Sequence, residues 1–563
     1  MSCSGSPVWT SGTTEVYHTG AWGNQIAGYF NPPSPCHTAC PVAGNIALWI
    51  QQIKERDYFG AWVTLTDNNP FPCVAGRICH HPCEPACNRG HHDEPIAIRG
   101  LERFVGDLAL AEGWKFPEVP ITMAETIAVV GGGPAGLAAA FHLRRLGYAV
   151  TVFEAKPELG GLLRYGIPPY RLSNDVLDRE IQRILDLGVA AKTDSPVRSR
   201  EDYEALKRDF DVLYLAMGAD TPKRLPVLDY NRGYVMDGAE YLELTNSGRV
   251  PELGRRIVVI GGGSAAMDAA RTARRDDKDI TILTLEAKEN MPCQREEVVE
   301  AEQEGIRLVN SAALKSVRMT AGGLLLHCIE VDFQPGAMRG QFTLEEKAGT
   351  EFTIEADHIV TSIGQDPDLN ILGGMLETSG ALIRIDEKYR TSDGKIFAGG
   401  DIASMERFVT AAFGMGKEAA KNIHRYLHPG STGDNAVPIN RYLKTAGSSI
   451  PARLITDVDV KVINKYYYDN APRENQGIVT AAERLKNFNE TQLNFSVDEA
   501  LHESGRCFSC GNCIFCDNCL FYCPDMAITK IDGGYQVNAD YCKGCGLCVK
   551  ECPTGSIAMF EGN

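Results

Sequence analysis

The stretch that decides the fold is Ile127-Ala-Val-Val-Gly131-Gly-Gly133-Pro-Ala-Gly136-Leu137. An apolar run, predicted to be a strand over 126–130, leads into glycines at G-x-G-x-x-G spacing, and a helix is expected to follow. Gly131 permits the tight turn, Gly133 lets the backbone approach a pyrophosphate, and Gly136 lets helix and strand pack closely. The phosphate would lie at the helix N-terminus, which favours anions. The stretch therefore predicts a dinucleotide-binding βαβ unit.

A carboxylate follows the next predicted strand. Residues 149–153 are expected to form that strand, and Glu154 stands eighteen residues after Gly136. A carboxylate at this place can bind ribose hydroxyls. The alternative is a glycine turn without a ligand, and the position of Glu154 argues against it.

A second unit of the same kind begins at Arg256. Its fingerprint, Ile257-Val-Val-Ile-Gly261-Gly-Gly263-Ser-Ala-Ala266, carries alanine in the third glycine's place, which is an accepted variant. The following strand is expected over 280–285, and Glu286 comes directly after it. A carboxylate there would bond the 2′-hydroxyl of NAD and repel the 2′-phosphate of NADP, so the sequence predicts NAD. Three arginines on the intervening helix are interpreted as a solvated face rather than phosphate ligands: Arg271, Arg274 and Arg275.

The cysteines are clustered. Of nineteen, seven precede residue 90 and ten lie between 507 and 552. Disulfide scaffolds are small and secreted, so clustering in a long chain indicates metal or redox chemistry and favours anaerobic life. The two middle cysteines, Cys293 and Cys328, are too isolated to form the C-x-x-C of a flavin disulfide reductase. We interpret them as structural thiols.

The last sixty residues repeat the spacing C-x2-C-x2-C-x3-C-P. In this pattern three close cysteines bind one [4Fe–4S] cubane, and the fourth binds the other. Structural zinc is the competing interpretation because C-x2-C pairs also fit zinc, but the repeated C-P ending favours iron–sulfur. The first cluster would take Cys513, Cys516, Cys519 and Cys552, and the second would take Cys542, Cys545, Cys548 and Cys523.

Composition limits the class of protein. With 563 residues we expect three or four domains, and 44% hydrophobic and 23% charged residues are ordinary for a globular protein. The net charge of −17 argues against nucleic-acid binding. No run of about 18 apolar residues and no signal peptide is present, so we expect no membrane span and a cytoplasmic location.

Residues 30–428 resemble the small subunit of glutamate synthase and its relatives. These include the matching half of dihydropyrimidine dehydrogenase and the large subunit of NADH-dependent ferredoxin:NADP oxidoreductase. The motifs that carry the resemblance are Cys36-His-Thr-Ala-Cys40-Pro, Gly76-Arg-Ile-Cys79-His-His-Pro-Cys83-Glu-Pro-Ala-Cys87, Gly160-Gly-Leu-Leu-Arg-Tyr165-Gly-Ile-Pro168, Gly261-Gly-Gly-Ser-Ala-Ala-Met-Asp-Ala-Ala-Arg271, Met291-Pro292, Ile363-Gly-Gln365 and Phe397-Ala-Gly-Gly-Asp401.

The resemblance implies FAD at the first site and a nicotinamide nucleotide at the second. It also implies that Asp401 reaches the ribityl–phosphate region and that residues 165–168 line the flavin. The predicted cofactor-binding residues are Gly131, Gly133, Pro134, Ala135, Gly136, Glu154, Gly161, Leu162, Tyr165, Ile167, Gly261, Gly263, Ser264, Ala265, Ala266, Glu286, Gly364, Gln365, Gly400 and Asp401.

The chain departs from the family in three places. Leu285 and Glu286 stand where members that use NADP usually carry two arginines, which supports NAD. The C-x2-C expected before Cys36 is absent. Ala75 replaces the first cysteine of C-G-R-x-C, with Cys73 nearby.

The family carries two [4Fe–4S] clusters in its N-terminal domain. By resemblance one would use Cys40, Cys79, Cys83 and Glu102, and the other needs Cys36, Cys87 and the missing pair. Cys507 and Cys510 are unassigned, and Glu499-Ala-Leu-His-Glu-Ser-Gly-Arg-Cys507-Phe-Ser-Cys510 resembles the family's own entry to that pair. We hypothesise that the tail folds back, or crosses a dimer, to complete a fourth cluster. The alternative is a single N-terminal cluster, with Cys507 and Cys510 idle or binding zinc.

The predicted fold is multidomain α/β, with two Rossmann-like domains between a helical iron–sulfur domain and an α+β ferredoxin-like domain. The predicted ranges are 1–120 for the N-terminal Fe–S domain, 121–254 and 366–429 for the FAD domain, 255–365 for the NAD domain, 430–505 for a polar, mostly helical or linker-like region and 506–563 for the ferredoxin domain.

These parts predict a flavoprotein subunit that transfers electrons between NAD(H) and a partner through FAD and several [4Fe–4S] clusters. The partner would be a 2-oxoacid, aldehyde or aryl-CoA oxidoreductase subunit, in a hetero-oligomer. No general base is assigned because the cofactors carry the chemistry. The alternatives are a free-standing NAD(P)H:ferredoxin oxidoreductase, the small subunit of a glutamate synthase and a scaffold with inert cofactors. The ferredoxin tail argues against the glutamate synthase subunit, and the intact fingerprints argue against the scaffold.

Overall fold

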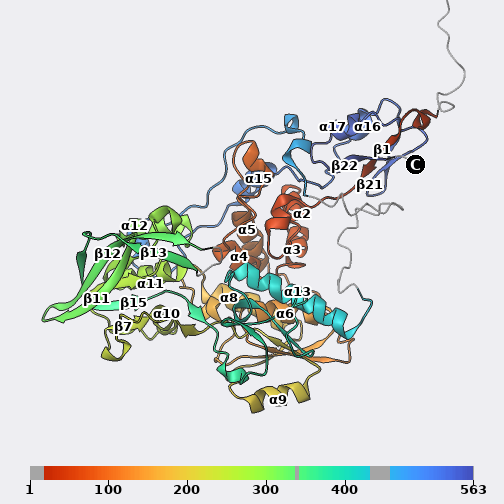
Figure 1. Cartoon of the computed structure of the whole chain (residues 1–563). Helices are drawn as coiled ribbons and strands as arrows, with labels where there is room; N and C mark the ends of the chain where they lie inside the picture. The colour runs from red at the N-terminus through yellow and green to blue at the C-terminus, as the bar shows by residue number, and fades with distance from the viewer. Residues whose placement is uncertain (1–17, 337–340, 432–456, 562–563) are drawn as a thin grey trace, which may run out of the picture.

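A computed structural model describes residues 18–336, 341–431 and 457–561 (Figure 1). The first helical layer contains α1 (Pro35–Ala39), α2 (Ile46–Lys54), α3 (Tyr58–Thr66), α4 (Pro72–Ile78) and α5 (Ile98–Ala111). Trp49, Trp62 and Leu101 are buried at its centre, at 2% exposure or less. Helix α15 (Val497–Gly505), from near the tail, packs against α2 and α5 and adds Ala500 to the same core.

The first nucleotide domain is a parallel sheet in the order β19-β5-β2-β3-β4. Its strands are β2 (Thr126–Val130), β3 (Ala149–Phe153), β4 (Ala190–Lys192), β5 (Val212–Leu215) and β19 (Ile396–Ala398). The helices are α6 (Pro134–Arg145), α7 (Leu162–Tyr165), α8 (Asn174–Leu185), α9 (Arg200–Asp209) and α13 (Val409–Leu427). Helix α13 crosses α6 closely, since a Cβ at Gly416 would lie 2.3 Å from the Ala135 carbonyl oxygen.

The second nucleotide domain has a parallel sheet in the order β10-β9-β8-β15-β7. Its strands are β7 (Val235–Asp237), β8 (Arg256–Ile260), β9 (Asp279–Leu283), β10 (Arg307–Val309) and β15 (His358–Thr361), with α10 (Gly238–Asn246), α11 (Ser264–Arg275) and α12 (Arg295–Gln303). A second, antiparallel layer contains β11 (Ala312–Thr320), β12 (Gly323–Pro335), β13 (Phe342–Glu346) and β14 (Phe352–Ala356).

Two of the three arginines of α11 that were expected on a solvated face are buried. Arg271 and Arg275 are buried, and their guanidinium groups bind Glu304 at 2.8 and 3.1 Å. Both guanidinium groups also lie over the Tyr170 ring, 4.9 and 3.8 Å from its centroid. The expectation was wrong for these two residues because the α12 segment places buried glutamates against α11.

The tail contains α16 (Asn518–Phe521), the hairpin of β20 (Ile528–Ile531) and β21 (Gly534–Val537), α17 (Leu547–Lys550) and β22 (Ile557–Glu561). Strand β1 (Gln25–Tyr29) pairs antiparallel with β22, so an N-terminal segment completes the tail domain (Figure 1). Sequence periodicity gave no sign of this pairing.

Residues 457–496, here called the strap, run across all the domains. The region 430–505, predicted as mostly helical or linker-like, contains two α-helices among its described residues, α14 (Ala481–Arg484) and α15. The strap is held by specific contacts instead: the Val458 amide donates to the Pro33 carbonyl at 3.0 Å, and the Thr491 amide donates to the Tyr170 carbonyl at 3.0 Å. Glu490 pairs with Arg77 and Arg103 at 2.7 and 2.8 Å.

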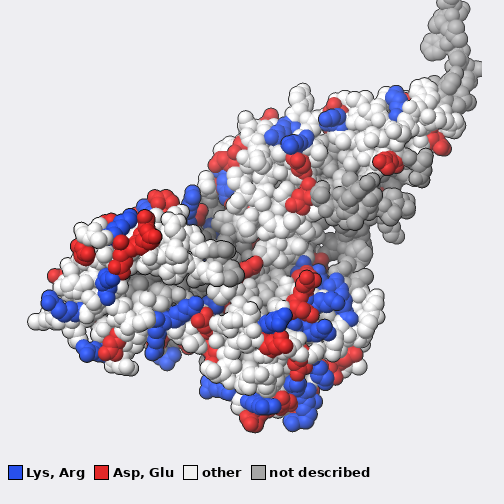
Figure 2. Space-filling model, in the orientation of Figure 1, with Lys and Arg blue, Asp and Glu red and all other residues white. Residues whose placement is uncertain are grey.

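No helix in the described ranges is long and apolar enough to cross a membrane. Acidic and basic side chains are interspersed on the face that Figure 2 shows.

Candidate redox cofactor sites

The first glycine turn leaves an open space at the N-terminus of α6. Gly131 has a φ of +108°, and a Cβ there would lie 2.3 Å from the Ala216 carbonyl oxygen, so only glycine fits. A Cβ at Gly133 would meet nothing nearer than the Cα of Gly161, at 3.8 Å. Helix α6 begins at Pro134 and Ala135, directly after this opening. A pyrophosphate can therefore approach the backbone at Gly133.

Glu154 lies over the same turn. Its carboxylate accepts hydrogen bonds from the Gly132 amide at 2.8 Å and the Lys156 amide at 2.9 Å. A Cβ at Gly136 would lie 1.9 Å from the Gly131 carbonyl oxygen, so helix and turn are packed together at that point. The carboxylate is buried and fixed by backbone donors.

Two of the other residues predicted for the flavin, Gly161 and Gly400, lie against Gly133 and Ala135 at this opening. Gly161 touches Gly133, and the segment after it turns through α7 so that Leu162 is exposed and Tyr165 is buried under the Lys156 ammonium. A Cβ at Gly400 would lie 2.9 Å from Ala135, which places the start of the Gly400–Ile402 turn, with Asp401, against α6. Gln365, after Gly364, accepts a hydrogen bond from Arg407 on its carbonyl. The Ile167 carbonyl accepts from Asn246 at 3.1 Å.

The second glycine turn repeats this geometry. Gly261 has a φ of +142°, and a Cβ there would lie 2.3 Å from the Ser362 carbonyl oxygen. A Cβ at Gly263 would meet no atom within 4 Å. The Glu286 carboxylate accepts from the Thr284 hydroxyl and lies 2.8 Å from the Cβ position of Gly262. In the first turn the equivalent distance, from Gly132 to Glu154, is 3.0 Å.

An ionic cluster that the sequence did not reveal supports the start of α11. The Ser264 hydroxyl donates to Glu297 at 2.7 Å, next to the exposed Ala265 and the buried Ala266. Arg171, from the first nucleotide domain, pairs with both Glu297 and Asp268, at 2.8 and 2.7 Å. Burial raises the pKa of Asp268 to about 6, although Arg171 opposes the shift. No spacing in the sequence links these residues.

Four predicted iron ligands line a cavity in the N-terminal domain, here called the N-terminal site: Cys40, Cys79, Cys83 and Glu102. Cys79 ends α4, and its sulfur accepts from the His81 amide at 3.2 Å. The Glu102 carboxylate accepts from Asn69 Nδ2 at 2.8 Å. Burial raises the pKa of Glu102 to about 8.

A second set of four thiols gathers from both parts of one chain and is here called the shared site. Burial raises the pKa of Cys36, and the neighbouring thiols of Cys87, Cys507 and Cys510 raise it further. Asn88 Nδ2 donates to Cys510 Sγ at 3.5 Å, and the Ser509 amide donates to Cys507 Sγ at 3.4 Å. Helix α15 brings the last two cysteines here, so no second copy of the chain is needed.

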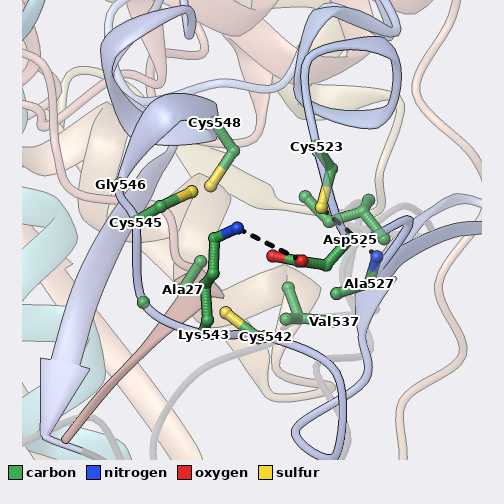
Figure 3. A pocket seen from close by; sticks show the side chains of 12 residues that line it. Ala27, Cys523, Asp525, Ala527, Val537, Cys542, Lys543, Cys545, Gly546 and Cys548 are labelled. Carbon is green, nitrogen blue, oxygen red and sulfur yellow. Dashed lines mark hydrogen bonds and ion pairs between the residues drawn. The ribbon is translucent and has the colours of Figure 1, made fainter. Parts of the chain in front are cut away.

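The tail holds two more sets. Site I is a cavity lined by the sulfurs of Cys513, Cys516, Cys519 and Cys552. Site II is lined by those of Cys523, Cys542, Cys545 and Cys548, together with an ion pair of Lys543 and Asp525 at 3.3 Å (Figure 3). Cys516 and Cys545 are exposed.

The remaining cysteines lie apart from these sets. Cys73 and Cys328 are buried, Cys293 is half-buried, and Cys3 lies outside the described residues. Among the described residues, no three His, Cys, Asp or Glu side chains are placed to hold one metal ion. At the N-terminal site, site I and site II the predicted ligands instead line cavities.

Three family models match the chain. Residues 125–416 match pyridine nucleotide-disulphide oxidoreductase, residues 31–114 match dihydropyrimidine dehydrogenase domain II with its 4Fe-4S cluster, and residues 535–558 match the 4Fe-4S binding domain. These matches support FAD and [4Fe–4S] clusters and agree with the family and the fold expected from the sequence.

Curated relatives extend the match over most of the chain. NADP(+)-dependent formate dehydrogenase subunit beta of Moorella thermoacetica is 33% identical over 509 residues, covering 85% of this chain and 70% of that protein. NADPH-Fe(3+) oxidoreductase subunit beta of Geobacter sulfurreducens is 30% identical over 514 residues, covering 85% and 75%. The homolog of NAD-dependent dihydropyrimidine dehydrogenase subunit PreT from Salmonella typhi is 31% identical over 405 residues, covering 70% and 91%. The chain therefore belongs to the pyridine nucleotide-disulphide oxidoreductase family, extended on one polypeptide by two iron–sulfur domains.

Proposed function

We propose that this chain is the nucleotide-facing electron-transfer subunit of a larger oxidoreductase, connecting NAD(H) to a catalytic partner through FAD and four [4Fe–4S] clusters. The observation that carries the proposal is that the N-terminal site adjoins the first nucleotide domain and the shared site adjoins site I. The His80 ring, beside Cys79, lies 4.5 Å from the Phe408 ring at the start of α13, so the N-terminal site adjoins the first nucleotide domain. Tyr468 donates to the carbonyls of Phe508 and Pro553, between the shared site and site I.

The residues at the first turn fit FAD. The opening above Gly133 is a cradle that a Cβ would fill, and the α6 N-terminus supplies backbone donors for a pyrophosphate. Glu154 would hold the adenosine ribose, while residues 161–167 and Asp401 would hold the rest of the cofactor. When bound, FAD exchanges a hydride with a nicotinamide and single electrons with iron–sulfur clusters. The protein's part is to bind the cofactors, orient them and shield them from water, and no side chain is assigned a role in proton transfer.

We assign NAD to the second turn. Glu286 lies over Gly262 as Glu154 lies over Gly132, so its carboxylate would meet the ribose 2′-hydroxyl and repel a 2′-phosphate. The names of the relatives include both NADP and NAD, so we base the choice between the two nucleotides on the residues of the second turn. We expect kcat/KM to favour NADH in the natural chain, and Leu285→Arg with Glu286→Arg to reverse the preference. A natural preference for NADPH would contradict the assignment.

Each set of four ligands is assigned one cluster. Three cysteines with Glu102 would hold the cluster of the N-terminal site, and the shared site, site I and site II would each hold one with four cysteines. Thiolates are the usual ligands of such clusters. Zinc at Cys507 and Cys510 would leave Cys36 and Cys87, their neighbours, without a role.

The relatives named above are subunits of formate dehydrogenase, Fe(3+) oxidoreductase and dihydropyrimidine dehydrogenase. We therefore propose a hetero-oligomer with a catalytic partner subunit, in the cytoplasm. For that partner we keep the class expected from the sequence, a 2-oxoacid, aldehyde or aryl-CoA oxidoreductase. The test is anaerobic native purification of the full chain, followed by mass spectrometry of what stays bound at fixed stoichiometry. A copurifying catalytic subunit that reduces NAD⁺ with its substrate supports the proposal. A chain that runs alone and exchanges electrons between NADH and a soluble ferredoxin overturns it in favour of the free-standing enzyme.

A further inference from the structure

Strand β1 crosses both cysteine sites of the tail. Alternate residues of a strand face the same side, and here Ala27 lines site II while Tyr29 lines site I. Antiparallel pairing with β22 fixes the register, with Tyr29 opposite Ile557. One strand therefore delivers a methyl group to one site and a phenol to the other.

Tyr29 donates a hydrogen bond to a predicted ligand of site I. Its hydroxyl lies 3.0 Å from Cys519 Sγ. The ring stacks on Tyr535, with centroids 5.8 Å apart and planes 24° apart, so the hydroxyl is fixed in direction. A phenol has an ordinary pKa of about 10 and keeps its proton at neutral pH. It is therefore a permanent donor to that sulfur.

Two more hydroxyls face the fourth ligand of site I. Thr554 Oγ1 and Ser556 Oγ lie 3.6 and 3.5 Å from Cys552 Sγ. Thr554 also donates to Ser556 at 3.2 Å, and both side chains are buried. Site I thus has hydroxyl groups at two of its four sulfurs.

Site II is built differently. Within the described part of the chain, no residue that lines its cavity carries a hydroxyl. The Ala527 amide donates to Cys523 Sγ at 3.2 Å. The charged groups in the cavity, Lys543 and Asp525, pair with each other and so offset one another (Figure 3).

We propose that Tyr29, together with Ser556, whose hydroxyl accepts from Thr554 and can donate to Cys552, raises the reduction potential of a cluster at site I above that of a cluster at site II. Donors to the sulfurs stabilise the more negative, reduced state and so raise the potential. The inference rests on the clusters assigned in the proposed function. Site I is also the tail site beside the shared site, because Tyr468 contacts the backbone next to both. The inner site of the tail is thus the better electron acceptor, which favours electron flow toward the nucleotide.

The test is a redox titration of the full chain, purified anaerobically and monitored by electron paramagnetic resonance. Tyr29→Phe keeps the stacked ring and removes the donor. We expect one cluster signal to move to a more negative potential. At a fixed solution potential its ratio of reduced to oxidised form should fall about tenfold, which corresponds to a shift of about 59 mV for one electron. The other signals stay in place, and Ser556→Ala moves the same signal in the same direction.

Tyr535→Phe is the matched control, because its hydroxyl donates to Asp517 and not to a sulfur. An unmoved signal in Tyr29→Phe protein with full iron content would overturn the inference, as would an equal shift in the control. The two proposals fail separately. Wild-type protein that lacks the iron for both tail clusters contradicts the cluster assignment, whereas full iron without a shift contradicts only the role of Tyr29.

Discussion

Gly263→Ala tests whether a nucleotide lies over the second glycine turn. The residue has an ordinary φ of −86°, and an added Cβ meets no protein atom within 4 Å. The fold should therefore tolerate the change, at a cost within about 0.5 kcal/mol. The new methyl group would occupy the space through which a pyrophosphate reaches the backbone at the start of α11.

The expected loss of affinity follows from the donors at this turn. A hydrogen bond to a charged group contributes about 1.5–3 kcal/mol. A methyl group that holds the pyrophosphate off one such donor should weaken NADH binding by roughly tenfold to a hundredfold, since about 1.4 kcal/mol is a factor of ten. The Kd for NADH, the melting temperature and the FAD content would be measured on one anaerobic preparation.

Gly261→Ala is the matched comparison in the same turn. Its φ of +142° disfavours any side chain, and its Cβ would lie 2.3 Å from the Ser362 carbonyl oxygen. It should lower the melting temperature, whereas Gly263→Ala should leave both melting temperature and FAD content unchanged. The reasoning is refuted if Gly263→Ala protein binds NADH with wild-type affinity.

Three further outcomes are expected. Cys507→Ser should lower the iron content from about 16 to about 12 per chain. Cys328→Ser is the control and should leave the iron content unchanged. About 12 irons in both the natural chain and the Cys507→Ser variant would contradict a cluster at the shared site. Glu490→Gln leaves two buried arginines of α4 and α5 with one carboxylate, that of Asp107. The free energy of unfolding should fall by about 1–3 kcal/mol after discounting the partial exposure of Glu490, and hydrogen exchange in the strap should accelerate. Unchanged exchange would contradict this. Burial lowers the pKa of Lys417 to about 8. Between pH 8 and about 10.5 the unfolded chain therefore binds more protons than the folded chain, and stability should rise with pH there. The midpoint of urea unfolding should rise less steeply with pH for Lys417→Met than for the natural chain.

Local patterns predicted the nucleotide folds closely. The strands expected at 126–130 and 149–153 have those bounds as β2 and β3, because apolar runs between glycine turns leave little choice. The strand expected at 280–285 runs from Asp279 to Leu283 instead. Its last expected residues turn away so that Thr284 can bond Glu286 above the glycine turn.

Contacts between distant segments could not be predicted in this way. The burial of Arg271 depends on Glu304 and on Tyr170 of the other nucleotide domain, and the strap's path depends on single polar contacts with each domain. Neither kind of contact leaves a periodic pattern in the sequence. The cysteine sets are an intermediate case: within the tail the spacing defines them, whereas the joining of Cys36 with Cys507 required comparison with a family motif.

The two iron–sulfur domains exchange segments. The N-terminal strand β1 pairs with β22 of the tail and brings Tyr29 to site I, while α15 from the tail side enters the N-terminal core and brings Cys507 to the shared site. Each domain therefore depends on the other for part of its core and for side chains at its cysteine site. A flexible linker between two independent domains would let the distance between site I and the shared site vary. The exchange, with Tyr468 packed between these sites, instead fixes their separation, and electron transfer between them would need that constancy.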